Sequence, residues 1–335
     1  HGGGGHVVLT VDPAEATAVA LHHRSRGTTT MLASLVAASP ETLMAQVEAL
    51  APLVRDSTFA GVHVEGPFLS DRRRGAQSPE FLRPPDKVLV DGLLSAGDGA
   101  VRVMTLAPEL PGAPGVITRL RSAGVLVALG HSDAGYDDFR DALDSLEGSG
   151  LVTHLANGMP PLHHRNPGPV AASLAAAATG QATVELIADG VHVADAFAEL
   201  VFAAAAPGHV VLITDAMAAA GMGDGVYELG PKRVRVSDGV ARLAGPPGDQ
   251  EDEDEDEPDE SRSIAGGTSH LLDVVRRVAM GTNVGLAEAV AAASLTPARL
   301  LGLDDEVGSL AAGKRADVLL VDDNLTLQRV MVRGE

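Results

Sequence analysis

Seven apolar runs, each followed by a polar or helix-like segment, constrain the fold of this chain more than any other feature. The runs cover residues 28–36, 59–64, 101–106, 125–129, 151–155, 183–187 and 209–214. Helical spacing occurs between them, for example over 41–54, 115–122 and 137–146. Continuous apolar runs that alternate with helices are typical of parallel strands buried on both faces. Because the chain opens in a glycine-rich segment where an eighth strand would just have ended, we predict a (β/α)8 TIM-like barrel, an α/β fold.

Polar side chains stand at the carboxyl ends of these runs or just past them. They are His1, Glu65, His131, His154, His192 and Asp215. The carboxyl ends of barrel strands converge on one face, where the active site is built. The sequence therefore predicts that these side chains share one site.

Glu65, His131 and His154 are the candidates for a divalent-metal site. A carboxylate buried at a strand end is costly unless it binds a cation or a hydrogen-bond donor. The chain has no cysteine, so any metal is bound by His, Asp or Glu, a donor set that accepts Zn²⁺, Fe²⁺ or Mn²⁺. Taken singly, Glu65 fits a helix cap and each histidine fits a hydrogen-bonded core residue. Their joint placement favours the metal site.

Asp215 follows the last run and is the candidate acid/base, because a carboxylate beside an activated water takes its proton and returns it to a leaving group. The alternative is an N-cap for the following segment.

Arg165, in a proline-rich loop, either clamps a phosphate or is a solvated loop base. We expect His22 and His23 on a helix surface and assign them no role.

The net charge of −20 argues against a nucleic-acid partner, because an acidic surface repels phosphates. Ten of the acids lie from Asp249 to Glu260. This acidic run is interpreted as a solvated loop insertion over 248–262, with cation or partner binding as the alternative.

No apolar stretch reaches the ~20 residues of a membrane span, so we expect no membrane association and a cytoplasmic protein. The chain begins without Met, so we expect a preceding segment to be missing.

After Asp215 the pattern changes. Short strands are expected at 226–229, 233–236 and 240–243, and helices at 269–280 and 286–293. The end of the chain, 308–332, is typical of strands with polar turns. We therefore divide the chain into a barrel, 1–303, and the C-terminal part of a small β domain, 304–335.

Taken together, the motifs resemble those of N-acetylglucosamine-6-phosphate deacetylases, a branch of the amidohydrolase superfamily. The segments that carry the resemblance, in order along the whole chain, are HGGGG, GVHVEGPFLSDRRRGAQ, ALGHSD, VTHLANGMPPLHHRNPG, IADGVHV, LITDAM, SIAGGTSHL and LTPARLLGLDDEVGSLAAGKRADVLLVD. The resemblance implies a metal-centred barrel, a small β-sandwich made from both chain termini, a cytoplasmic homodimer and hydrolysis of the acetamide of an amino-sugar phosphate.

The resemblance also implies roles for individual residues. Glu65, His131 and His154 match the metal ligands, Asp215 the acid/base, and His1 the second histidine of an HxH motif that some members use for a second metal. One or two ions, with zinc preferred, are therefore expected. The implied sugar-phosphate contacts and substrate-covering loop are Ala76, Gln77, Asn157, Gly158, Arg165, His192, Ile264, Ala265 and Gly266.

One departure bears on the substrate site: Gln77 stands where many members carry histidine, so we expect one altered contact. Other amidohydrolase chemistries, such as cyclic amide hydrolysis or deamination, and an inactive scaffold protein are the alternatives. The absence of a lysine at a strand end suited to carbamylation argues against the cyclic amidase, and the four filled positions argue against the scaffold.

Overall fold

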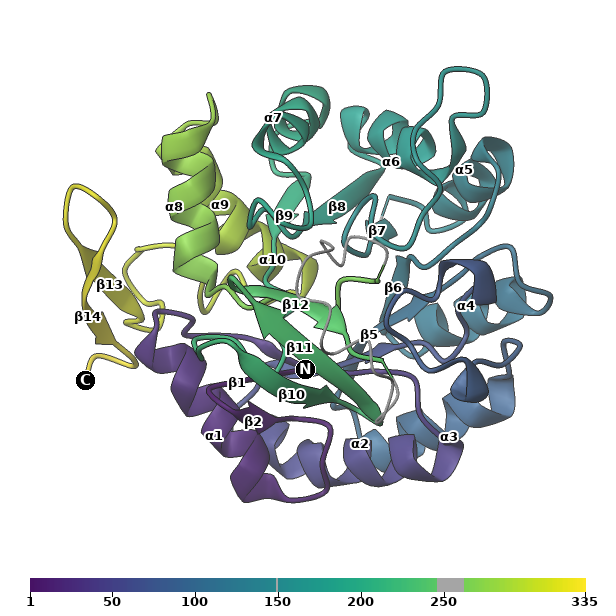
Figure 1. The fold of residues 1–335 in the computed structure, drawn as a ribbon, viewed down its shortest axis with the longest axis horizontal. Helices are drawn as coiled ribbons and strands as arrows, with labels where there is room; N and C mark the ends of the chain where they lie inside the picture. Colours follow the sequence, from purple (N-terminus) through teal and green to yellow (C-terminus); the bar gives the residue numbers. More distant parts are fainter. Residues whose placement is uncertain (149, 246–261) are drawn as a thin grey trace.

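The computed structural model describes residues 1–148, 150–245 and 262–335, and its centre is a parallel sheet of seven strands among these residues. The spatial order of the strands follows the chain, and the sheet curls into the greater part of a barrel (Figure 1). The strands are β3 (Leu32–Leu35), β4 (Gly61–Glu65), β5 (Val101–Leu106), β6 (Leu126–Leu129), β7 (Gly150–Val152), β8 (Ala182–Leu186) and β9 (Val210–Leu212). All seven predicted strands are present, and the TIM-like α/β prediction is confirmed.

The segment at the N-terminus lies beside the segment that follows β9. Strands β1 (Gly2–Gly3) and β2 (His6–Val7) form a short antiparallel pair, and the amide of Gly2 donates to the carbonyl of Ala216 at 3.0 Å. A cavity of about 610 Å³ lies next to this pair, between β3 and β9. Its lining residues include Gly2, Leu32 and Leu212. The two edge strands of the described sheet therefore face this cavity rather than each other.

Helices connect the strands and cover the outside of the sheet (Figure 1). Several begin at a side-chain cap that satisfies a free backbone amide: Asp12 caps α1, Ser39 caps α2 and Asp86 caps α3. The helices are α1 (Pro13–Ser25), α2 (Pro40–Arg55), α3 (Lys87–Gly97), α4 (Ala113–Ser122), α5 (Tyr136–Asp144), α6 (Gly168–Ala178) and α7 (Asp195–Ala204), followed by α8 (Leu271–Gly281), α9 (Leu286–Ala293) and α10 (Leu295–Leu300). Two short 3-10 helices, Asp71–Arg73 and Pro79–Phe81, lie after β4.

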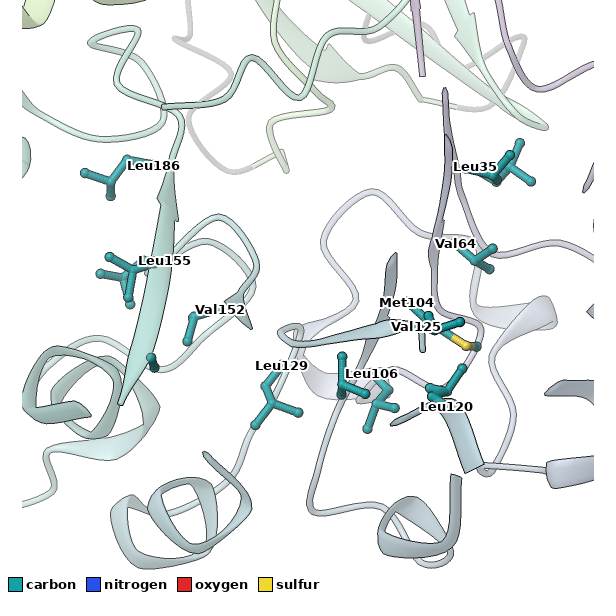
Figure 2. Packing of buried hydrophobic residues seen from close by; sticks show 14 of the residues in the cluster. Leu35, Val64, Met104, Leu106, Leu120, Val125, Leu129, Val152, Leu155 and Leu186 are labelled. Atoms are coloured by element: carbon teal, nitrogen blue, oxygen red, sulfur yellow. The ribbon is translucent and has the colours of Figure 1, made fainter. Parts of the chain in front are cut away.

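The main core lies between the sheet and these helices. Figure 2 shows Met104 and Leu106 of β5 near Leu120 of α4, all members of one buried apolar cluster. Burying a side chain of this size contributes roughly 1.5–3 kcal/mol. The core therefore holds the strand ends, and the loops that follow them, in fixed positions.

Two smaller sheets lie outside the parallel one. Strands β10 (Gly225–Leu229), β11 (Lys232–Ser237) and β12 (Val240–Leu243) form an antiparallel sheet, which confirms the strands predicted there. Strands β13 (Val318–Val321) and β14 (Leu327–Met331) form a hairpin near the C-terminus.

The division of the chain into a barrel and a small β domain at 303/304, and the β-sandwich, stay predictions. Of the predicted acidic insertion, residues 248–261 lie outside the described residues. Across the described ranges, no helix is both long and apolar enough to span a membrane.

Candidate active site

Glu65, His131 and His154 come together at the carboxyl edge of the sheet. Glu65 is the last residue of β4, His131 follows β6 and His154 follows β7. Oxygen Oε1 of Glu65 lies 3.1 Å from Nε2 of His131 and 2.9 Å from Nε2 of His154. All three residues are buried. We name them the first ligand group.

His1 and Asp215 extend this group on the side of Glu65 Oε2. Nε2 of His1 lies 3.1 Å from Oδ1 of Asp215 and 3.6 Å from Oε2 of Glu65. The other ring nitrogen of His1, Nδ1, lies 2.9 Å from the carbonyl oxygen of Ser34, to which it donates. His1, Glu65 and Asp215 form the second ligand group. Because Glu65 belongs to both groups, its two oxygens face two adjacent places for a cation.

Three of these side chains project from strained backbone. His131, His154 and Asp215 have φ values of 47°, 27° and 49°, in the left-handed region that non-glycine residues rarely adopt. Such strain costs of order 1–3 kcal/mol per residue and persists where the surrounding packing imposes it. The turn after each strand therefore sets the direction of a functional side chain.

Neighbouring polar groups fix the orientation of the ligands. His131 donates through Nδ1 to the backbone carbonyl of Arg73 at 2.7 Å, which directs Nε2 toward Glu65 and the place for a cation. The side chain of Arg73 pairs with Asp133 at 2.7 Å. Gln77, predicted as a substrate contact, is buried and donates from Nε2 to Oε2 of Glu65 at 2.8 Å. The contacts from the Arg73 carbonyl and from Gln77 therefore hold His131 and Glu65 in defined orientations.

The charges of the groups shift their proton affinities in opposite directions. Burial alone would raise the pKa of Glu65, but hydrogen bonds from His131 and His154 outweigh it and hold this pKa well below its ordinary value. Burial would lower the pKa of His154 and of His1, but their carboxylate partners raise both to about 9. Burial is likewise outweighed at Asp215, whose pKa is lowered by the hydrogen bond from His1. Both carboxylates are therefore ionised at neutral pH.

The donor set fits a divalent transition-metal ion. Two imidazoles and a carboxylate are the protein ligands of open catalytic zinc sites. His154 Nδ1 is buried and has no hydrogen-bond partner among the described residues, so this ring is held on the Glu65 side alone. The low pKa of Glu65 also favours the ionised form that binds a cation. The first ligand group therefore has the chemistry to hold one ion, and the second group a further ion.

His192 lies in the loop after β8 and is held by Asp189. Asp189 Oδ2 accepts a hydrogen bond from His192 Nδ1 at 2.8 Å, and its other oxygen accepts from the backbone amides of Val191 and His192. Burial would raise the pKa of Asp189, but these hydrogen bonds lower it. The imidazole is thereby oriented, with Nε2 available to another partner.

Five other predicted contacts lie on two loops near the ligand groups. The amide of Ala265 donates to the carbonyl of Ala241 of β12, while Gly267 donates to the carbonyl of Asp215 at 2.8 Å, so the loop with Ile264, Ala265 and Gly266 lies directly beside Asp215. Gly158 packs against His131, and Asn157 contacts the His154 carbonyl at 3.3 Å.

Two predicted residues make no hydrogen bond or ion pair with the ligand groups in the described part of the chain. Arg165 is exposed, and the hydrogen bonds described for it go to His163 and His164. Ala76 packs against an apolar cluster that includes Val36 and Ala265. The structure thus brings the metal and acid/base candidates together, and it gives Arg165 no contact with them in the described part of the chain.

Sequence reasoning missed the residues that orient the site. Ser34, Arg73 and Asp189 act on His1, His131 and His192 respectively. A backbone carbonyl carries no sequence signal, so the roles of Ser34 and Arg73 were not predictable. The role of Asp189 was predictable, because a carboxylate commonly orients a functional histidine by accepting from its ring nitrogen, and Asp189 stands three residues before His192 in the same loop.

A TIM-like sheet with a His/Glu/Asp cluster at its carboxyl edge defines the class of metal-dependent hydrolases built on this fold. Residues 15–335 match the model of the amidohydrolase family. The chain belongs to this family, and within it to the branch of the N-acetylglucosamine-6-phosphate deacetylases.

Relatives and solved structures support the branch. The chain is 37% identical to the N-acetylgalactosamine-6-phosphate deacetylase of Escherichia coli O157:H7, over 100% of this chain and 84% of the relative. It is 34% identical to the human N-acetylglucosamine-6-phosphate deacetylase, over 93% of this chain and 73% of the relative. A structure of the Mycobacterium smegmatis N-acetyl-D-glucosamine-6-phosphate deacetylase, a variant in complex with N-acetyl-D-glucosamine-6-phosphate, superposes with a TM-score of 0.90 at 42% identity, covering 100% of this chain and 83% of that one.

Proposed function

We propose that this chain hydrolyses the acetamide of N-acetylglucosamine 6-phosphate to glucosamine 6-phosphate and acetate. The observation that carries the proposal is the position of Asp215, an ionised carboxylate 3.1 Å from His1 and next to the first ligand group. A base beside a cation site is the arrangement that amide hydrolysis needs. The relatives named above act on amino-sugar phosphates, which supplies the substrate class.

Glu65, His131 and His154 would hold the first ion, and His1 with Asp215 would hold a second. The chemistry that a bound divalent ion supplies here is polarisation of the amide carbonyl and a lower pKa for the attacking water. Zinc suits the two imidazoles and one carboxylate, and iron or manganese are the other candidates.

Asp215 accepts a proton from the water whose oxygen bonds to the acetyl carbon. It then returns this proton to the sugar nitrogen as the C–N bond breaks, so acetate and the amine leave. His192, oriented by Asp189, would donate from Nε2 to the carbonyl oxygen as negative charge develops there, a role that requires a proton on Nε2 as well as on Nδ1; a single oxyanion donor of this kind contributes roughly 3 kcal/mol. The base and the oxyanion donor thus come from the loops after β9 and β8.

Substrate recognition rests on the loops around the ligand groups. Asn157 and Gly158, and the segment Ile264–Ala265–Gly266, border the site and would contact the sugar. Arg165 would bind the phosphate, and its exposed position suits a site shared with a neighbouring subunit. We therefore propose a homodimer, and a cytoplasmic location where sugar phosphates are handled.

The test is acetate release by the metal-loaded protein from N-acetylglucosamine 6-phosphate, the unphosphorylated sugar and N-acetylgalactosamine 6-phosphate. Release mainly from the first substrate supports the proposal. Faster release from the galactosamine compound would move the specificity to that epimer, as in the Escherichia coli relative. No release from any of them, with metal bound, would refute the proposal.

A further inference from the structure

A cluster of histidines lies outside the active site, where α1 meets the segment before α8. The ring centroids of His22, His23 and His270 are 5.2–6.0 Å apart. Both His22 and His23 lie on a helix as predicted, but the expectation of a surface position is wrong for His23, which is buried. Its Nε2 donates to the carbonyl of Gly2, so the N-terminal segment covers it.

His22 and His270 point their Nε2 atoms at each other. These two nitrogens are 3.0 Å apart. The opposite nitrogen of His270, Nδ1, faces Oδ2 of Asp273 at 3.4 Å. A carboxylate on Nδ1 keeps the proton there and leaves a lone pair on Nε2, which is how histidines that bind metals are usually oriented.

Gly221 leaves open a space next to both Nε2 atoms. A Cβ added to Gly221 would lie 2.7 Å from Nε2 of His270 and 2.9 Å from Nε2 of His22, and the φ of this glycine is 76°. Glycine is therefore required at this position for the two nitrogens to stay open. His22 is partly exposed, which provides a path from solvent.

We propose that His22 and His270 form an additional metal site, separate from both ligand groups of the active site, that binds Zn²⁺ through both Nε2 atoms with water as the remaining ligands. Two imidazoles at a zinc–nitrogen distance of about 2.0–2.1 Å and a tetrahedral angle stand about 3.3 Å apart. The observed separation of 3.0 Å needs only a small movement to reach this value. With two protein ligands, the ion is expected to exchange readily and to bind more weakly than an ion at the first ligand group.

An ion at this place would join α1 to the segment that follows the loop of Ile264, Ala265 and Gly266. The site would thus connect the N-terminal part of the chain to the loop beside Asp215. This inference does not rest on the proposed function, because it concerns binding at a different place.

The test is to count zinc ions by equilibrium dialysis of chelator-treated protein, comparing wild type with His22→Gln and His270→Gln. Glutamine keeps a hydrogen-bonding group at each position. Each variant should bind one zinc ion fewer per chain than wild type, and the lost ion should be the weaker one. The matched control is His6→Gln, which removes a nearby imidazole that pairs with Glu15 and should leave the count unchanged.

Equal zinc counts and affinities in wild type and both variants would overturn the proposal and leave the pair as an imidazole–imidazole hydrogen bond. A second measurement, on the wild-type chain, tests the proposal even if a variant fails to fold. Ring-nitrogen NMR spectra should show the Nε2 resonances of His22 and His270 shifting as the weaker ion binds. Resonances that do not move across the titration would equally overturn it.

Discussion

Replacing Gln77 by leucine tests whether this residue acts on the metal site or on the substrate. Its side chain donates to Oε2 of Glu65 at 2.8 Å and accepts from the amide of Ala37 at 2.9 Å. Leucine has a similar volume and can make neither bond. We therefore expect the Gln77→Leu variant to hold its first metal ion less tightly.

The expected size follows from these two contacts. A hydrogen bond to a charged group contributes about 1.5–3 kcal/mol, and the loss of a group that orients a metal ligand typically lowers affinity 10–100-fold. We expect a 10–100-fold weaker affinity for zinc, equivalent to about 1.4–2.7 kcal/mol. The amide of Ala37, left without its acceptor, should destabilise the fold by a further 1–3 kcal/mol or so.

The assay is competition for zinc against a chelator of known affinity, with kcat and KM measured at saturating zinc. Gln46→Leu is the matched control, because Gln46 is also a buried glutamine but its Oε1 has no partner among the described residues. The control should keep wild-type zinc affinity. An unchanged zinc affinity in Gln77→Leu with an increased KM alone would refute the reasoning and return Gln77 to the role of substrate contact.

Three further predictions concern the same site. Asp215→Asn should lower kcat by about 10²–10⁴-fold while an ion remains at the first ligand group, as checked by acetate release and metal content; full activity would remove the base role. Gly158→Ala places a Cβ 2.7 Å from Nδ1 of His131 at a φ of 61°, and should lower stability by roughly 1–3 kcal/mol in thermal unfolding and weaken zinc binding; Gly99→Ala, at a φ of 85° with nothing within 4 Å, should show the φ strain alone. In the metal-free protein the pKa of His154 is about 9 against an ordinary 6.5, so its contribution to stability is complete below pH 6.5 and lost as the pH rises through 9. The Tm of the metal-free protein should fall over that window, and zinc should bind more tightly as the pH rises; a flat Tm would contradict this.

The sheet was predictable because burial on both faces leaves a direct mark on composition. Each predicted run overlaps its strand, but the ends differ: 151–155 was expected, and β7 covers Gly150–Val152. Leu155 belongs to the run because it remains buried past the end of β7. Apolarity reports burial rather than strand geometry, so the ends of strands were the least certain part.

Burial of His23 could not be predicted from the helix that carries it. The helical pattern of α1 places this residue among polar neighbours, and the residues that cover it, Gly2 and Gly3, are separated from it by some twenty positions. A glycine pair carries no apolar signal for the contact it makes. Non-local packing of this kind is settled by the fold and not by the local sequence.

In the active site, the residue types were predictable from the sequence, but the backbone geometry was not. Glu65, His131, His154 and Asp215 were identifiable because each combines a ligand or acid/base side chain with the end of a strand. The left-handed backbone angles of His131, His154 and Asp215 were not predictable, since nothing in their residue types indicates a positive φ. The strain at three of these positions is tolerated because buried strands precede them and hydrogen bonds hold the side chains. It follows that the direction of the ligands, and with it the ability to bind a cation, depends on the sheet core as much as on the ligands themselves.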